Sequence, residues 1–429
     1  MKREKWLYDE LCSWDNIYRA ARKARQRKRS KIDVQRFEYD LEENLMQIQS
    51  ELVEESYRPG KYNRFTVTEP KERDICAAPY KDRVVHHALI NVLEPIWEKG
   101  FYYHSYACRV GKGMHKAIMV CQKYIRRNKY VLKCDISKYF ASIDHEILKG
   151  ILKRKIGDEK LLRLIDIIIV ESPEQNCPAV LFPGDDLFTL MERKRGIPIG
   201  NLTSQFFANV YLNEMDKFIK HECKVRDYLR YMDDFLLFSD SKEELANIRK
   251  RLEAFLNGLR LELHSRKTQI FPVKNGIKFL GFHIFEKRMR LQKENIRRFE
   301  KRMRERQRQY ADYKIDSETI SQGVVAWLGH AGHGDTRRLI NKLLYKYSFR
   351  RDKAKQRTGF CVAGRGTTTM AMTIYVPGIA TTTTRRTRTT ISDSVVPVHQ
   401  RTGCLLYGAD GVYESPALFL LARANKTAS

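Results

Sequence analysis

Apolar residues recur at helical spacing in the N-terminal part of the chain. Between positions 37 and 52 they repeat every three or four residues, at Phe37, Leu41, Leu45, Ile48 and Leu52. Because this spacing places them on one face, it predicts a single amphipathic helix that packs on a core and ends at the breaker "RPG" (58–60). The preceding run "RAARKARQRKRSK" (19–31) predicts a helix with a charged, solvated face, and phosphate binding is the alternative.

From Phe65 onward, short β-prone runs alternate with helical ones, which indicates an α+β fold without a long βαβ repeat. Two of the predicted strand segments carry carboxylates. "YVLKCDIS" (130–137) is typical of a buried strand with one acid, and "RDYLRYMDDFLLFSDS" (226–241) predicts a hairpin with acids at its bend. The other predicted elements are a helix opened by Asp144, a helix over 241–259 and a strand pair over 276–285.

The C-terminal third changes character twice. Residues 287–347 are predicted to be helical and are very basic. After about Arg357 the chain is rich in threonine and lacks clear periodicity, so we expect a poorly ordered tail. We place the boundary between these two parts at 350–358.

Charge points to a polyanionic partner. The 429 residues include 80 Lys and Arg against 52 Asp and Glu, for a net charge of +28, and nucleic acid is the first candidate. The N-terminus has no apolar signal core, and the most apolar run (161–170) is too short and too charged to cross a bilayer, so no membrane association is expected. Nine scattered cysteines without a C-x-x-C pair suit a reducing cytoplasm and disfavour a zinc module.

Three aspartates carry the candidate chemistry: Asp135, Asp233 and Asp234. Carboxylates that meet at strand ends in a basic protein are what two Mg²⁺ ions need, since these ions take oxygen ligands and leave positions open for substrate phosphates. The reaction expected from such a site is in-line nucleotidyl transfer. The alternative is plain turn chemistry, because Asp is common at hairpin bends.

Seven blocks of the sequence, in order between about residues 60 and 350, resemble reverse transcriptases. They are "KERDICAAPYKDRVVHHALINVLEPIWEKGF" (71–101), "HSYACRVGKGMHKAI" (104–118), "LKCDISKYFASIDH" (132–145), "YMDD" (231–234), "HSRKTQI" (264–270), "KFLGF" (278–282) and "WLGHAGHGDTRRLINKL" (327–343). The resemblance implies a right-hand polymerase fold with fingers, a palm built from an antiparallel sheet and helices, and a helical thumb. It divides the chain into a basic helical region (1–60), fingers and palm (61–283), thumb (284–352) and the threonine-rich tail (353–429).

The resemblance also implies roles for individual residues. Lys71 and Arg73 would lie near the incoming triphosphate, Phe140 would exclude the ribose 2′-hydroxyl, and Lys267 belongs to the basic block. The metal-binding residues it implies are Asp135, Ile136, Asp233 and Asp234.

Each of these assignments has a plainer alternative. Phe140 would serve as a core aromatic in another fold, and Lys71, Arg73 and Lys267 would be solvated charges. His330 and His333 have the spacing of a metal pair, but the resemblance makes them thumb residues rather than zinc ligands.

One block departs from the common pattern. Most reverse transcriptases carry a string like Q-G-x-x-x-S-P, whereas this chain reads "IGNLTSQ", from Ile199 and Gly200 to Gln205. The departure resembles the enzymes of diversity-generating retroelements, which copy a template RNA with frequent errors at adenines and thereby alter a target gene. A glutamine can hydrogen-bond in the nucleotide pocket, whereas isoleucine has neither donor nor acceptor, so we expect weaker rejection of mispairs.

The function implied is therefore that of a low-fidelity RNA-directed DNA polymerase, bacterial or phage-encoded and cytoplasmic. Its partners would be template RNA, the RNA/cDNA hybrid, dNTPs, two Mg²⁺ ions and a small basic accessory protein that assembles as a ring. Two alternatives stay open: a group II intron or retron-type enzyme, and a phage-defence RNA-binding protein that keeps the fold. The threonine runs at 367–369 and 381–384 would fit translation through an adenine-rich template repeat, or an unrelated tail.

Overall fold

The computed structural model describes residues 3–68, 72–173 and 180–351 of the chain. It forms two compact units, and the second begins at Gly276. No helix of the described part is long and apolar enough to cross a membrane. The expected tail (353–429) and Lys71 lie outside the described residues.

Four helices open the first unit: α1 (Leu7–Cys12), α2 (Trp14–Ala24), α3 (Ile32–Tyr39) and α4 (Leu41–Val53). The single helix expected across 37–52 was wrong, because the backbone leaves helical geometry at Asp40 (φ −111°, ψ 49°) and separates α3 from α4. The arginine-rich run is helical only as far as Ala24, and turns follow. The apolar face was predicted correctly, since Phe37, Leu45, Ile48 and Leu52 are all buried.

Two antiparallel sheets lie in the described part of the first unit. The smaller is a ribbon of β1 (Asn63–Val67) and β2 (Arg73–Ala77). The larger has the order β4-β5-β3-β6, and each neighbouring pair is antiparallel. Its strands are β3 (Tyr130–Asp135), β4 (Asp227–Tyr231), β5 (Asp234–Ser239) and β6 (Gln269–Pro272). The predicted strand at 130–137 and the predicted hairpin at 226–241 are confirmed.

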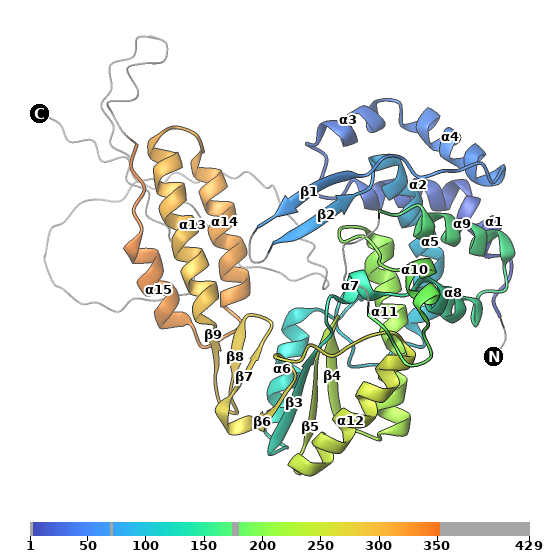
Figure 1. Ribbon diagram of the computed structural model, residues 1–429. Helices are drawn as coiled ribbons and strands as arrows, with labels where there is room; N and C mark the ends of the chain where they lie inside the picture. The colour runs from blue at the N-terminus through green and yellow to red at the C-terminus, as the bar shows by residue number, and fades with distance from the viewer. Residues whose placement is uncertain (1–2, 69–71, 174–179, 352–429) are drawn as a thin grey trace, which may run out of the picture. The chain divides into compact units, whose positions relative to one another are not determined.

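Helices surround the larger sheet. Helix α12 (Lys242–Gly258) packs against β3, β5 and β6, and α6 (Met114–Ile125) lies beside β4 (Figure 1). As predicted, Asp144 opens a helix, because its carboxylate accepts a hydrogen bond from the Ile147 N–H at 3.0 Å. The other elements of this unit are α5 (Tyr80–Glu98), α7 (Tyr139–Ser142), α8 (His145–Lys153), α9 (Glu159–Val170), α10 (Leu187–Glu192), α11 (Leu202–Lys217), the short π-helix η1 (Phe218–Glu222) and the 3₁₀ helix η2 (Val273–Asn275).

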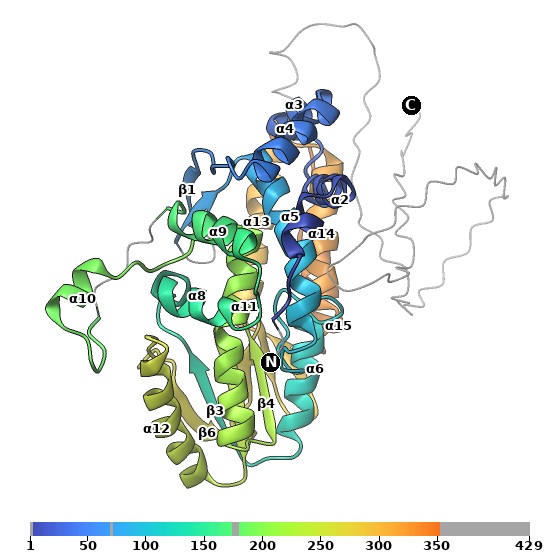
Figure 2. The ribbon, with the colours of Figure 1, turned by 90° about the vertical axis from the view of Figure 1, so that its right-hand side faces the viewer.

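The core of the first unit is continuous from the N-terminal helices to the sheet. It includes Leu11, Ile17 and Leu45 from the first helices together with Leu132 and Phe235 from the sheet. Helix α5 contacts α1, α2, α3 and α11 and so joins these layers. Figure 2 shows α10 standing apart from α8 and α9.

The second unit combines a small antiparallel sheet with helices. The strands β7 (Ile277–Phe279), β8 (Phe282–Ile284) and β9 (Met289–Leu291) pair in chain order. The predicted strand pair at 276–285 is therefore confirmed, whereas β9 interrupts the helical region expected over 287–347. Helices α13 (Lys293–Ala311), α14 (Ser317–Ala331) and α15 (Arg337–Lys346) follow, and a stacked pair of rings, Phe299 and Trp327, lies between α13 and α14.

Candidate active site

The three predicted acids come from two adjacent strand ends. Asp135 is the last residue of β3 and Asp234 is the first of β5, and the two are direct partners in the strand register. Asp233 lies in the two-residue turn between β4 and β5, and its carbonyl accepts a hydrogen bond from the Ile136 N–H at 3.3 Å. The strand pairing therefore gathers the aspartates that the sequence singled out.

Burial and neighbouring negative charge raise the pKa values of Asp233 and Asp234. Burial and the nearby Asp135 raise the pKa of Asp233, and Lys267 and Arg73 partly offset this. Burial raises the pKa of Asp234 to about 7, with further contributions from Asp135 and Asp233 that Lys133 opposes. Like charges in a low-dielectric site disfavour the ionised form in this way, and a bound cation would reverse the effect.

Cationic side chains border the aspartates. The Lys267 ammonium pairs with Asp135, and the Lys133 ammonium lies 3.6 Å from Asp234 Oδ2. Arg73 is close enough to lower the pKa of Asp233. The structure thus brings Arg73 and Lys267 to the acids. Lys133 was missed, although its position two residues before Asp135 on one strand places both on the same face.

The donor set fits a divalent cation of the Mg²⁺ type. Within the described residues, no group of three His, Cys, Asp or Glu side chains is already arranged around a metal position. Mg²⁺ is often held by only one or two carboxylates, with water and substrate phosphates completing its shell. Asp135 and Asp233 can supply these carboxylates. Oδ2 of Asp234 forms an ion pair with Lys133, and its buried Oδ1 has no hydrogen-bond partner in the described part.

The segment 196–205 forms a turn and the start of α11. The Ile199 carbonyl accepts a hydrogen bond from the Cys76 N–H of β2 at 3.0 Å. Gly200 has a φ of +125°, which side-chain-bearing residues rarely adopt, and a Cβ there would lie 3.0 Å from Ile75. The turn is therefore fastened to β2 through main-chain contacts, while the Ile199 side chain is half-buried.

Phe140 and Gln205 flank this turn on different elements. The Phe140 carbonyl accepts a hydrogen bond from the Ile197 N–H at 2.9 Å, which places α7 beside the turn. The Phe140 ring is half-buried and packs edge-on to Tyr139 at 5.7 Å. Gln205, in the first turn of α11, accepts a hydrogen bond from Cys108 at 3.4 Å. Strand β2 carries both Arg73 and Cys76 and so connects this turn with the acids.

Acids at paired strand ends, bordered by lysine and arginine in an α+β fold, define a class of site suited to phosphoryl-type transfer. The model of the family "Reverse transcriptase (RNA-dependent DNA polymerase)" matches residues 67–284, just over half of the chain. The chain belongs to the reverse transcriptase family, and its enzyme class is RNA-directed DNA polymerase.

The chain is also similar to curated proteins. Protein YkfC of Escherichia coli (strain K12) is 26% identical over 284 residues, covering 57% of this chain and 71% of YkfC. The group II intron-encoded protein LtrA of Lactococcus lactis subsp. cremoris is 24% identical over 309 residues, and the match spans 57% of this chain but only half of LtrA. An apo telomerase structure from Candida tropicalis aligns at 14% identity over 54% of this chain and 55% of the telomerase chain, with a TM-score of 0.37, which is too low to define the fold.

Proposed function

We propose that this reverse transcriptase copies a template RNA into cDNA with low fidelity at adenines, and that the altered cDNA diversifies a target gene. The observation that carries the proposal is Ile199, an apolar side chain at the position where the reverse transcriptase pattern described above has glutamine. The Ile199 side chain is half-buried, and its main chain is hydrogen-bonded to β2. Both features support a position of this side chain beside the bound nucleotide. The preference for adenine rests on the resemblance alone.

The catalytic residues we propose are Asp135, Asp233 and Asp234. Asp135 and Asp233 would hold two Mg²⁺ ions together with substrate phosphates and the main chain at Ile136, and Asp234 would support them. When bound, these ions would lower the pKa of the primer 3′-hydroxyl and neutralise the leaving pyrophosphate. Lys267 and Arg73, with Lys71, would place positive charge beside the triphosphate.

The remaining assignments follow the same resemblance. Phe140 would exclude the ribose 2′-hydroxyl, and Gly200 and Gln205 would shape the nucleotide pocket. We assign the β1–β2 ribbon to the fingers, the four-stranded sheet to the palm and helices α13–α15 to the thumb. Partners beyond template RNA and dNTPs would include a small basic accessory protein.

Replacement of Ile199 by glutamine tests the proposal. We expect Ile199→Gln to retain synthesis and to lower misincorporation opposite template adenine, because a hydrogen-bonding group would again penalise mispairs by about 1 to 3 kcal/mol, or about tenfold to a hundredfold. The fold should tolerate the change, since the contact of this residue with β2 is made by its main chain. Ile199→Val, which stays apolar and β-branched, is the matched control. Sequencing of the cDNA measures the error spectrum, and an unchanged spectrum in Ile199→Gln would contradict the low-fidelity assignment.

A group II intron function is the second candidate, and the similarity to LtrA favours it. The flanking DNA distinguishes the two. A near-repeat pair that differs mainly at adenines indicates a diversity-generating element, whereas an intron around the gene indicates the alternative.

A further inference from the structure

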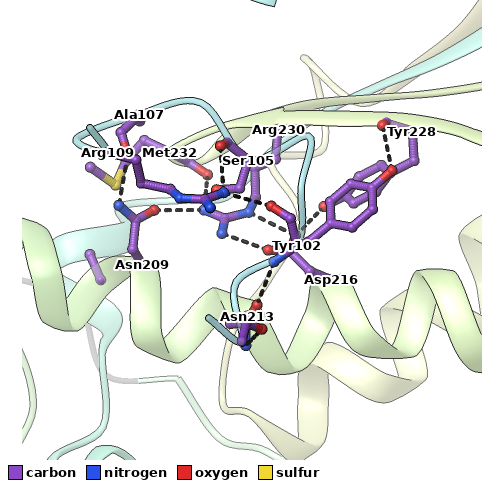
Figure 3. Close-up of polar contacts among 12 residues, drawn as sticks. Tyr102, Ser105, Ala107, Arg109, Asn209, Asn213, Asp216, Tyr228, Arg230 and Met232 are labelled. Carbon is purple, nitrogen blue, oxygen red and sulfur yellow. Dashed lines mark hydrogen bonds and ion pairs between the residues drawn. The ribbon is translucent and has the colours of Figure 1, made fainter. Parts of the chain in front are cut away.

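Arg230 is fully buried two residues before the turn that carries Asp233. Its side chain has 0% exposure, as does that of Asp216 on α11. The guanidinium forms a fork of two hydrogen bonds to this carboxylate, with Nε 2.8 Å from Oδ1 and Nη2 2.6 Å from Oδ2 (Figure 3). Such two-point pairing fixes the plane of the guanidinium as well as its position.

The remaining guanidinium nitrogen reaches the turn itself. Nη1 of Arg230 donates to the Asn209 side-chain oxygen at 3.1 Å and to the Met232 carbonyl at 3.2 Å. Met232 has a φ of 56°, a left-handed conformation that residues with a side chain rarely adopt. The bonded carbonyl belongs to the peptide group that joins Met232 to Asp233. Arg230 therefore holds the peptide that immediately precedes the aspartate.

The guanidinium is in turn held from several sides. Asn209 donates to the Ala107 carbonyl at 2.8 Å, which fixes the orientation of its amide, and Tyr228 donates to Asp216 Oδ1 at 2.6 Å (Figure 3). The main chain of Arg230 also bonds to the loop before α6, through the His104 carbonyl and the Tyr106 N–H. Helix α11, strand β4 and this loop thus converge on one cation.

We propose that Arg230 is a positioning residue for the polymerase reaction, and that it fixes the Met232–Asp233 peptide so that the Asp233 carboxylate stays beside Asp135. This inference rests on the proposed catalytic role of Asp233. A buried ion pair contributes little net stability compared with a well-packed apolar pair, so its use here is explained by the direction it gives to Nη1.

The decisive variant removes both charges together. Arg230→Met alone would leave Asp216 ionised in the core and unfold the protein, whereas Arg230→Met with Asp216→Leu leaves no buried charge at this place, although the Tyr228 hydroxyl and the Asn209 side-chain oxygen lose these bonds. We expect the double variant to fold with a lower urea midpoint than wild type and to bind template–primer with unchanged affinity. Its kcat should fall about tenfold to a hundredfold, since small displacements of a reacting group have effects of this size. The Mg²⁺ concentration for half-maximal rate should rise.

Two further variants separate positioning from stability. Arg230→Lys keeps a charge opposite Asp216 but cannot form the fork and reach Met232 together, so kcat should be intermediate. Tyr228→Phe is the matched control, because it removes a bond to the same carboxylate without touching the turn. It should lower stability and leave kcat and the Mg²⁺ requirement near wild type.

The outcomes are distinct. Wild-type kcat and Mg²⁺ dependence in the folded double variant, or in Arg230→Lys should the double variant not fold, would overturn the inference. Asp233→Asn serves as the reference in the same assay. If it is inactive while the double variant is unaffected, only the positioning role is lost. An active Asp233→Asn enzyme would overturn the catalytic assignment and the inference with it.

Discussion

The chemistry of Asp135 and Asp233 depends on how strand pairing places them. Each is an ordinary acid in sequence, but the pairing of β3 with β5 brings both to one end of the sheet. There Asp233 is half-buried beside a like charge; desolvation and this charge raise its pKa, and lysine and arginine moderate the effect. A carboxylate in this setting gains from binding a cation, because the cation relieves the repulsion.

Removal of either negative charge should abolish synthesis. We expect Asp135→Asn and Asp233→Asn to lose dNTP incorporation, because an amide is a poor ligand for Mg²⁺, and to retain RNA binding. Asp166→Asn on α9 is a matched control, since its carboxylate pairs with Lys149 on the neighbouring helix. Primer extension and filter binding measure the two properties. Polymerisation within about tenfold of wild type in either active-site variant would contradict the two-metal assignment.

At the scale of the element, α5 joins the N-terminal helices to the rest of the first unit, and it carries a buried histidine. Burial, with the nearby His87 and Arg83, lowers the pKa of His86 to about 3 from its usual value near 6.5. The folded protein therefore keeps this imidazole neutral at a pH where the unfolded chain binds a proton. Its contribution to stability is present above pH 6.5 and is lost as the pH falls towards 3.

A pH series on His86→Leu tests this linkage. Wild type should lose about 2 kcal/mol of unfolding free energy through this residue between pH 7.5 and pH 5. Leucine fills a similar volume and cannot take up a proton, so the variant should lose correspondingly less over the same interval. Urea unfolding at the two pH values measures the difference. Equal losses in both proteins would show that His86 is not a source of acid sensitivity.

Element identity was largely predictable where the local pattern was strong. The strand at 130–137, the acidic hairpin and the capped helix after Asp144 agree with the structure. The signals that predict them are hydrophobic periodicity, turn residues and a helix cap, and these signals lie within a few residues of one another in sequence. The break at Asp40 was not predictable, since the apolar spacing of 37–52 continues across it. Packing of α3 and α4 on the same core, rather than their spacing, decides where the helix stops.

At the scale of the whole molecule, the net charge of +28 favours a polyanionic ligand. Each phosphate contact made by Lys or Arg releases counterions, so the affinity for template–primer should fall steeply with salt. With six to ten such contacts, we expect a loss of about a thousandfold or more between 50 and 200 mM salt. Fluorescence anisotropy over this range measures the slope. A flat response would indicate that the positive charge does not serve nucleic-acid binding.

The sequence by itself determined the family, the α+β class and the three aspartates, because these depend on residue types at short, ordered spacings. Only the tertiary structure decided which charges meet. The Lys267–Asp135 pair joins residues 132 positions apart, and Arg230, an unremarkable strand residue in sequence, becomes the buried partner of Asp216 and Met232. Such contacts depend on strand register and on which side chains the core encloses, and no local stretch of sequence specifies either of these.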